Sequence, residues 1–137
     1  MRRALVTGGS GDIGAAICRR LAADGCYVYV YQNLAKATDL VTEITGTSGS
    51  AEVIAFDVTN AEDSRRILEA LTATSPIDIL VNNAGIHDDA IFPGMSASQW
   101  HRVLAVALDG FYNVAQPLTM PMIRNRWGRI LNITSIA

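Results

Sequence analysis

A glycine-rich turn near the start of the chain is the first feature that could do chemistry. Gly9-Ser10-Gly11-Asp12-Ile13-Gly14 fits the pattern G-x-G-x-x-G and lies between an apolar run and a segment with helical periodicity. Glycines let a backbone turn tightly and approach a pyrophosphate, while the start of the following helix offers free N–H groups and the positive end of its dipole. The turn therefore predicts a dinucleotide site. The alternative is a turn that serves only to pack helix against strand.

Polar residues follow three later apolar runs. Asp57 follows the first run, Asn82 and Asn83 follow the second, and Ser135 follows the third. Because ligands of open parallel sheets bind at the carboxyl ends of strands, Asp57 is a candidate binding residue. The Ser135 hydroxyl could stabilise an oxyanion that develops on a substrate. The plainer alternatives are helix capping or loop solvation for Asp57, and turn formation for the asparagines and Ser135.

The elements that must position these residues are short apolar runs alternating with helical patterns. Nearly continuous apolar runs are typical of parallel strands buried on both faces. Helices are expected over residues 12–24 and 35–44, with Gly25 just past the first, and Asn60 is expected to cap the next helix. The predicted strands are residues 4–7, 27–31, 52–56, 77–81 and 129–133.

The longest helix is expected to begin at Ser96 or Ser98. Pro117 and Pro121 predict a kink or an interruption in its later part. The order βαβαβαβαβ, with no linker or repeat, predicts one α/β domain over residues 1–137: a doubly wound parallel sheet of the Rossmann type in three layers, α/β/α. The apolar stripe of the long helix is formed by Trp100, Leu104 and Leu108.

Composition and charge exclude several classes of function. The 137 residues are 50% hydrophobic, and 11 Lys and Arg against 13 Asp and Glu give a net charge of −2. Without a basic run, no nucleic-acid partner is expected. No apolar stretch of about 18 residues lacks a charge or breaker, so no membrane span is expected. The first residues leave no room for a signal peptide, and we expect a cytoplasmic protein.

Neither the cysteines nor the histidines predict a metal site. Cys18 and Cys26 fit no metal-binding spacing and are expected to be reduced, partly buried thiols. The run His87-Asp88-Asp89 is interpreted as a loop, because adjacent residues point apart and no further ligand is spaced to join them.

Four motifs, taken in order, resemble the short-chain dehydrogenase/reductase family. The chain looks most like the family's 3-oxoacyl-(acyl carrier protein) reductases, which Trp100 followed by Gly110–Val114 also suggests. The resemblance covers the whole chain but only the first part of a typical family member. The motifs are Thr7–Gly14, Asp57-Val58, Asn82-Asn83-Ala84-Gly85 and Asn132-Ile133-Thr134-Ser135.

The resemblance implies an NAD(P)H-dependent ketoreductase that transfers a hydride to a carbonyl of a small-molecule or acyl-carrier-bound substrate, here a 3-oxoacyl thioester. It implies homo-oligomers that pair through the long helix, and it matches Ser135 to the family's catalytic serine, which hydrogen-bonds the substrate oxygen. Asp57 and Val58 would hold the adenine. The full set of implied cofactor contacts is Gly8, Ser10, Gly11, Ile13, Gly14, Asp57, Val58, Asn83, Ala84 and Gly85.

NADP is the expected cofactor, with NAD as the alternative. A carboxylate after the second strand would bind the ribose hydroxyl of NAD and repel a 2′-phosphate. Residues 31–34 read Tyr-Gln-Asn-Leu, and Lys36 is the nearest cation. The glycine turn departs from the family at Gly11, often an arginine that meets the 2′-phosphate, and at Asp12, often a glycine.

Two further departures favour a chain that does not catalyse alone. Ala107 stands where the family usually carries a catalytic asparagine. The family's acid is a tyrosine four residues before a lysine, and the sequence ends two residues after Ser135 without that motif. We expect a piece of a chain about twice this length, with an unpaired apolar edge at its last strand. The alternatives are a non-catalytic dinucleotide-binding module or sensor, and a half-domain that pairs with another subunit.

Overall fold

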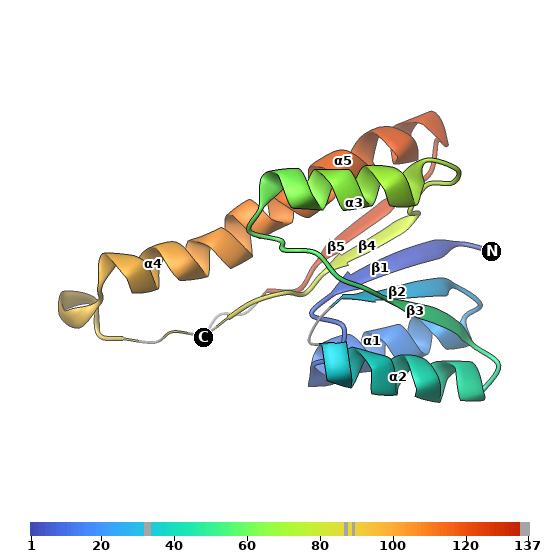
Figure 1. Cartoon of the computed structure of the whole chain (residues 1–137), viewed down its shortest axis with the longest axis horizontal. Helices are drawn as coiled ribbons and strands as arrows, with labels where there is room; N and C mark the ends of the chain where they lie inside the picture. The colour runs from blue at the N-terminus through green and yellow to red at the C-terminus, as the bar shows by residue number, and fades with distance from the viewer. Residues whose placement is uncertain (32–33, 87, 89, 135–137) are drawn as a thin grey trace.

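The computed structural model describes residues 1–31, 34–86, 88 and 90–134, which contain one parallel sheet of five strands (Figure 1). The strand order is β3-β2-β1-β4-β5, so the sheet grows from β1 first to one side and then to the other. This is the doubly wound Rossmann-type arrangement that the alternating pattern predicts. The strands are β1 (Arg3–Thr7), β2 (Tyr27–Tyr31), β3 (Ser50–Ile54), β4 (Ile79–Asn82) and β5 (Arg129–Asn132).

Helices connect successive strands. In the part of the chain that the structure describes, none of them is long and apolar enough to cross a membrane. A short 3₁₀ helix precedes α4, and a π-helical turn joins α4 to α5. The helical elements are α1 (Asp12–Ala23), α2 (Leu34–Gly46), α3 (Ala61–Thr72), η1 (Phe92–Gly94), α4 (Ala97–Leu104), η2 (Ala105–Asp109) and α5 (Gly110–Arg124).

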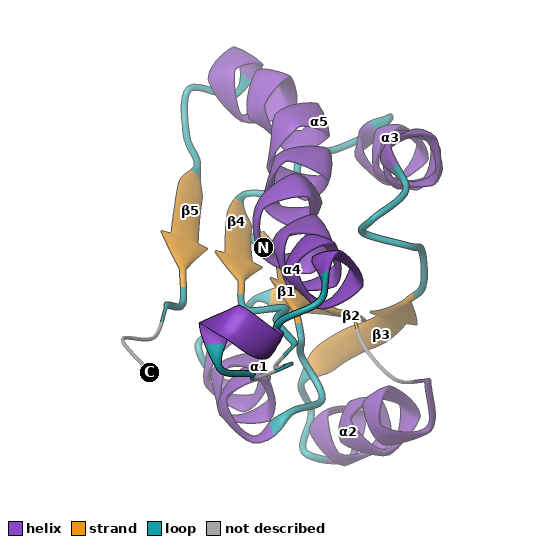
Figure 2. Ribbon diagram, turned by 90° about the vertical axis from the view of Figure 1, so that its left-hand side faces the viewer, coloured by secondary structure: helices purple, strands orange, loops and turns teal. Residues whose placement is uncertain are grey.

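One helical layer covers each face of the sheet, α1 and α2 on one side and α3 and α5 on the other (Figure 2). The side chains of β1 alternate between the two layers: Ala4 and Val6 pack with α1 and α2, whereas Leu5 packs with α3 and α5. All three are fully buried, and burial of a Val or Leu side chain contributes about 1.5–3 kcal/mol. The three-layer prediction is confirmed.

Helix ends follow the capping residues identified in the sequence. Gly25 has φ +89°, and its N–H donates to the Ala22 carbonyl while the next N–H donates to the Leu21 carbonyl, both at 3.0 Å. These bonds form a Schellman motif that ends α1. Asn60 caps α3, and a capping box between Ser96 and Gln99 shows that Ser96 rather than Ser98 opens α4.

Strand boundaries differ from the sequence prediction by two residues in the third and fourth strands. The strand predicted over residues 52–56 is paired over Ser50–Ile54, because β2 ends at Tyr31, the partner of Ile54. The chain then leaves the sheet, and Phe56 lines a cavity instead. The next strand, predicted over residues 77–81, begins at Ile79.

The expected interruption of the long helix at its prolines is wrong. Pro117 and Pro121 both lie inside α5, which continues through them. Each proline lacks the N–H that would bond the carbonyl four residues earlier. Buried Val114 and Leu118 hold the helix against the sheet and offset this loss. The irregular turn instead precedes the prolines, at Ala105–Asp109.

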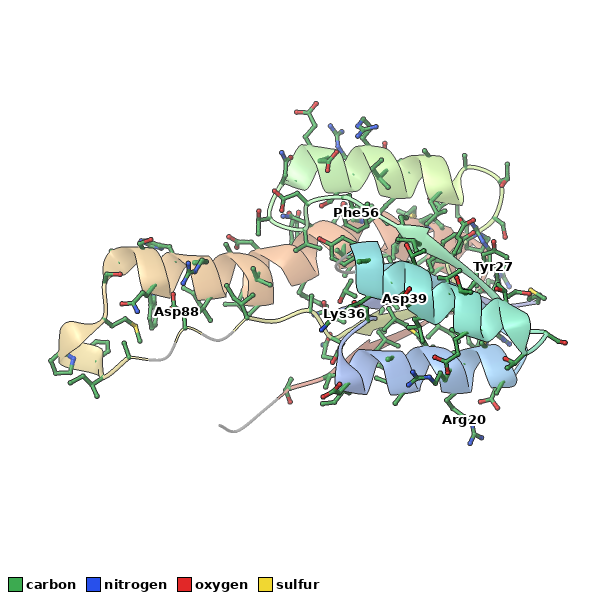
Figure 3. The ribbon with its side chains drawn as sticks, turned by 60° about the horizontal axis from the view of Figure 1, so that its bottom comes forward. Arg20, Tyr27, Lys36, Asp39, Phe56 and Asp88 are labelled. Carbon is green, nitrogen blue, oxygen red and sulfur yellow. The ribbon has the colours of Figure 1, made fainter. Side chains whose placement is uncertain are left out.

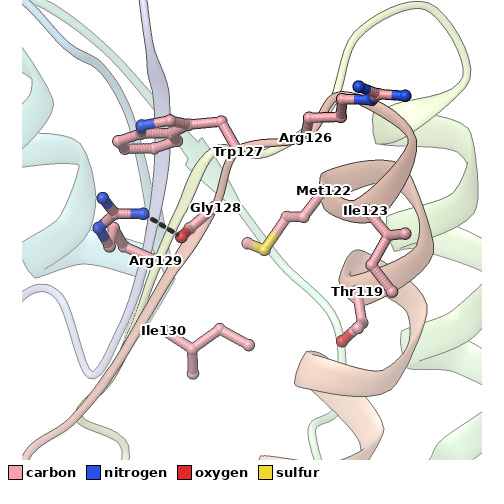
Figure 4. Close-up of a pocket in the computed structure, with 8 residues that line it drawn as sticks. All are labelled: Thr119, Met122, Ile123, Arg126, Trp127, Gly128, Arg129 and Ile130. Carbon is pink, nitrogen blue, oxygen red and sulfur yellow. Dashed lines mark hydrogen bonds between the residues drawn. The ribbon is translucent and has the colours of Figure 1, made fainter.

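The sheet is open on the side of β5. This strand is outermost among the described strands, and Ile130 and Leu131 are 41% and 47% exposed. A groove of about 490 Å³ separates β5 from α5, with Ile130 of the strand and Met122 of the helix among its lining residues (Figure 4). An apolar edge of this kind offers unpaired backbone groups to another strand.

Arg3 ties together the amino end of the sheet, opposite the glycine turn. Its backbone N–H donates to Asp78 Oδ2 at 2.8 Å. Its guanidinium donates to the Tyr29 hydroxyl at 2.7 Å, to the Leu71 carbonyl at 3.0 Å and to the Ser75 carbonyl. One side chain therefore joins β1, β2 and the last turn of α3.

We predict that Arg3→Met lowers the free energy of unfolding by about 2 kcal/mol, because hydrogen bonds to a charged group contribute about 1.5–3 kcal/mol and the orphaned carbonyls are part-buried. Chemical denaturation measures the loss. Arg20→Met is the matched control, since Arg20 pairs with Asp24 on an exposed helix surface, where ion pairs contribute little. Equal losses in the two variants would contradict the prediction.

Candidate functional site

The candidate site lies where the strand order of the sheet reverses. From β1 the chain passes to β2 on one side and later to β4 on the other, so the loops after β1 and β4 diverge at the carboxyl edge. Doubly wound sheets bind ligands in the crevice at this point. The loops that begin with Gly8 and Asn83 meet there, and the loop containing Asp57 and Val58 follows β3 at the same edge.

The turn after β1 is tight and depends on its glycines. Gly8 has φ +64°, in the left-handed region that glycine adopts without strain. The Gly9 N–H donates to the Tyr31 carbonyl at 2.9 Å, which fastens the turn to β2. A Cβ atom on Gly14 would overlap the Gly8 carbonyl oxygen. Glycine at position 14 therefore lets α1 pack directly on the turn.

The turn presents polar groups that lack protein partners. Ser10 Oγ is buried and has no hydrogen-bond partner within the described part of the chain. No side chain caps α1 at Gly11, so the first helical N–H groups and the positive dipole end are available to an anion. A phosphate fits this arrangement. Asp12 places a carboxylate in the same first turn, and Ile13 is 60% exposed beside it.

Thr7 and Asn83 join the glycine turn to the loop after β4. The buried Thr7 Oγ1 accepts the backbone N–H groups of Asn83 and Ala84, each at 3.0 Å. Asn83 Nδ2 donates to the Gly8 carbonyl at 3.1 Å. The Asn83 side chain thus braces the turn rather than only forming a loop. Sequence reasoning does not single out Thr7, whose only signal is its place directly before Gly8.

Asp57 and Val58 lie on the wall of a cavity of about 420 Å³ beside the turn. Asp57 Oδ1 accepts hydrogen bonds from the Thr59 backbone N–H at 2.9 Å and hydroxyl at 2.7 Å. Its Oδ2 has no hydrogen-bond partner among the described residues, and Asn60 rather than Asp57 caps α3. The cavity is lined by Tyr31, Ala55, Phe56, Asp57, Val58, Thr59, Ala84, Gly85, Ile86 and Val106.

Asn113 on α5 holds the Val58 side of this cavity and is also missed by sequence reasoning. It is 9% exposed, and its Nδ2 donates to the Val58 carbonyl at 2.9 Å. One turn earlier, a Cβ on Gly110 would come within 3.3 Å of a Val58 methyl group. The preceding π turn contributes Val106 to the cavity wall. The sequence signals are a polar residue between apolar helix positions and its place in the Gly110–Val114 segment, to which no role is assigned.

Other residues expected at the site have less support from the geometry. Ser135 lies outside the described residues. Gly85 lines the cavity, but a Cβ there would meet nothing within 4 Å, so packing does not require glycine at this position. Ala107 lies exposed in the π turn, which therefore forms without an asparagine side chain.

The acidic run after β4 makes a loop contact. Asp88 accepts hydrogen bonds from Gln99 Nε2 at 3.2 Å and from Arg102, which ties this loop to α4. His87 and Asp89 lie outside the described residues. Among the residues that are described, no three His, Cys, Asp or Glu side chains gather as a metal site would require.

Burial raises the pKa of two groups around the turn, which are then uncharged at neutral pH. Cys18 lies beneath the turn with its Sγ 3.7 Å from the Gly9 carbonyl oxygen, and burial raises the pKa of its thiol to about 12. Burial also raises the pKa of the Tyr31 hydroxyl, while a hydrogen bond from the Val58 backbone N–H acts in the opposite direction. Neither group adds a negative charge where an anion would bind.

We predict that Gly14→Ala lowers the free energy of unfolding by about 2 kcal/mol or more, because the added methyl group overlaps backbone that cannot move aside cheaply. Gly11→Ala is the matched control: its Cβ would be 3.6 Å from the nearest heavy atom, and φ is −73°. Its loss should stay below about 1 kcal/mol. Urea titration measures the free energy of unfolding of both variants. A Gly14→Ala variant as stable as wild type would show that the turn is not packed as described.

Comparison with known proteins agrees with this geometry. Acetoacetyl-CoA reductase of Allochromatium vinosum is 40% identical over 139 residues, which cover 98% of this chain and 56% of that protein. The 3-oxoacyl-[acyl-carrier-protein] reductase FabG of Aggregatibacter actinomycetemcomitans is 38% identical over 137 residues, covering 97% of this chain and 57% of that one. The chain thus spans about half the length of these relatives.

Solved structures show the same fold. A gluconate 5-dehydrogenase from Burkholderia cenocepacia, crystallised with NADP and tartrate, is 37% identical with a TM-score of 0.90, covering 98% of this chain and 53% of that one. A putative NAD(P)-dependent gluconate 5-dehydrogenase from Beutenbergia cavernae, with bound NADP, is 34% identical with a TM-score of 0.93. That match covers 98% of this chain and 54% of the other.

A sequence profile described as short chain dehydrogenase matches residues 2–137. The match includes the glycine turn, the loop of Asp57 and Val58 and the bracing Asn83, which the fold brings to one edge of the sheet. The chain therefore belongs to the short-chain dehydrogenase family of oxidoreductases.

Proposed function

We propose that this chain forms the nucleotide-binding part of an NAD(P)H-dependent ketoreductase that reduces a carbonyl group, with a 3-oxoacyl thioester as substrate. The observation that carries the proposal is the glycine turn, where a buried Ser10 Oγ without a partner and an uncapped helix start adjoin a cavity of about 420 Å³. Relatives named as acetoacetyl-CoA and 3-oxoacyl-[acyl-carrier-protein] reductases support the substrate class.

The dinucleotide would lie across the carboxyl edge of the sheet. Asp57 Oδ2, which has no partner among the described residues, supplies an acceptor that complements the amino group of adenine, and Val58 lines the cavity beside it. When bound, the nicotinamide ring supplies the hydride. The residues proposed to hold the cofactor are Gly8, Ser10, Gly11, Ile13, Gly14, Asp57, Val58, Asn83, Ala84 and Gly85.

NADP is the proposed form of the cofactor. Two structural neighbours were crystallised with NADP. The chain has no carboxylate in residues 31–34, where one would repel a 2′-phosphate. Lys36 stands in the first turn of α2, so a cation and the positive end of a helix lie after β2 (Figure 3).

Ser135 is proposed to hydrogen-bond the substrate oxygen. It follows β5 by three residues, and β5 pairs with β4 beside the turn. Such a donor stabilises the negative charge that develops on the oxygen during hydride transfer. The family's acid motif, a tyrosine four residues before a lysine, does not occur in these 137 residues. Hydride transfer to a carbonyl also requires a proton donor, and we assign that role to no residue of this sequence.

A non-catalytic dinucleotide-binding module is the second candidate function. Ala107 favours it, because this π-turn position carries no side-chain donor or acceptor. Calorimetry with NADPH and NADH, read beside turnover assays, separates the ketoreductase from the binding module, since a sensor binds without turnover.

We also place the protein in the cytoplasm, which suits two cysteines that are both free and buried.

We predict that a form of the protein with its proton donor in place oxidises NADPH with a 3-oxoacyl thioester, and that Ser135→Ala lowers its kcat by about 100-fold to 1000-fold, as expected for loss of one oxyanion donor. The affinity for NADPH should not change, because the serine contacts the substrate. Steady-state measurement of NADPH absorbance gives both kcat and the apparent affinity for NADPH. NADPH binding without turnover of any carbonyl would favour the binding module, and absence of binding would contradict both functions.

We further propose that two copies pair through the long helix. Exposed apolar side chains follow its whole length, including Trp100 at 50%, Leu108 at 61% and Ile123 at 61% exposure. The helix projects past the carboxyl ends of the strands, where the sheet does not cover it (Figure 1). Exposed large apolar side chains on a helix that nothing covers are typical of a protein–protein interface.

We predict that Leu108→Glu shifts the protein from dimer to monomer, because it places a charge in the centre of the apolar surface. Sedimentation velocity over a range of concentrations measures the change. Thr42→Glu adds the same charge at an exposed position of α2, on the other face of the sheet, and serves as control. A wild-type protein that stays monomeric at high concentration would exclude this pairing.

A further inference from the structure

Two aromatic side chains stand together on the cavity beside the glycine turn. The ring centroids of Tyr31 and Phe56 are 4.7 Å apart, with an interplanar angle of 33°, and both residues line the cavity that holds Asp57 and Val58. Tyr31 is only half-buried, although it is the last residue of an interior strand. A large aromatic surface facing a cavity of this size needs an explanation.

The position of the pair follows from the strand register. Tyr31 pairs with Thr7 on one side and with Ile54 on the other, so it marks the carboxyl end of β1, β2 and β3 together. Tyr27, Tyr29 and Tyr31 lie on the same face of β2. Phe56 reaches the cavity because the chain leaves the sheet after Ile54 (Figure 3).

We infer that Tyr31 and Phe56 form an aromatic wall against which the adenine base of the dinucleotide packs, and that the Tyr31 ring sets the affinity for the adenosine half. This inference rests on the proposed function and adds a recognition element to it. Flat aromatic rings stack with bases whatever the base's hydrogen-bonding edge, so the wall supplies affinity while the free Asp57 Oδ2 recognises the amino group on that edge.

The rest of the cavity suits a flat apolar ligand with one polar edge. Ala84, Ile86 and Val106 contribute aliphatic groups to its lining. Asp57 Oδ2 has no partner among the described residues and is available to an amino group. Cavities of this kind, largely apolar with a few convergent polar groups, are typical small-molecule sites.

The plainer explanation is that the two rings only cover an end of the sheet. The same strand offers a matched comparison, because Tyr27 lies on the same face of β2 at its other end and packs against Tyr29 with centroids 5.2 Å apart. A covering role predicts similar effects of substitution at both positions. A binding role predicts an effect on adenosine-containing ligands at Tyr31 alone.

The test is calorimetric titration of wild type, Tyr31→Phe, Tyr31→Ala, Tyr31→Leu and Tyr27→Ala with NADPH and with reduced nicotinamide mononucleotide, which lacks the adenosine half. We expect Tyr31→Ala and Tyr31→Leu to weaken NADPH binding about tenfold, as loss of one base-stacking contact does. Tyr31→Phe keeps the ring and should bind as wild type does, as should Tyr27→Ala. Affinity for the mononucleotide should be the same in all five proteins.

Tyr31→Leu keeps an apolar side chain of similar bulk, so a folding defect in the alanine variant leaves the comparison intact, and thermal unfolding of each variant checks this. Equal NADPH affinity in wild type and Tyr31→Leu would overturn the inference while the proposed function stands. Equal losses for NADPH and the mononucleotide would also overturn it, because the ring would then act only on the fold. A wild-type protein that binds no dinucleotide would overturn the proposed function and this inference together.

Discussion

The Thr7 hydroxyl, at the end of β1, joins the loops after β1 and β4 at the point where the strand order of the sheet reverses. It accepts two backbone N–H groups from the start of the loop after β4, and Asn83 returns a hydrogen bond to the Gly8 carbonyl. Because Gly14 has no Cβ, α1 reaches the same carbonyl. Three segments therefore converge on one peptide group, and the anion-binding turn and the cavity beside it depend on that convergence.

The long helix supports the other side of the cavity. A buried Asn113 holds the Val58 carbonyl, and the π turn before it contributes Val106, so one long helix both shapes the cavity proposed to hold the base and carries the proposed interface. A buried amide bonded in this way confers a defined geometry as well as stability. Helix α5 tolerates Pro117 and Pro121 because packing of its inner face outweighs two lost backbone hydrogen bonds.

Much of the fold was predictable because hydrophobic period and capping chemistry are local. The alternation of apolar runs and helical patterns predicted the layers. Gly25 marked the end of a helix by the left-handed backbone conformation that glycine adopts, and Asn60 and Ser96 marked helix starts by the hydrogen bonds that their side chains accept. The two-residue shift of β3 was not predictable from its own residues, because pairing with β2 decides where that strand ends. For the same reason Phe56 leaves the sheet and joins the cavity.

The amino-acid sequence by itself determined the family, the parallel order of elements and the place of the glycine turn, since glycines followed directly by a helix have few uses other than a tight turn at the end of a strand. The tertiary structure alone decided which distant groups serve that turn. Thr7 meets Asn83 across 76 residues, and Asn113 meets Val58 across 55. Such contacts depend on strand register and helix packing, which bring together side chains whose local sequence carries no trace of the partner.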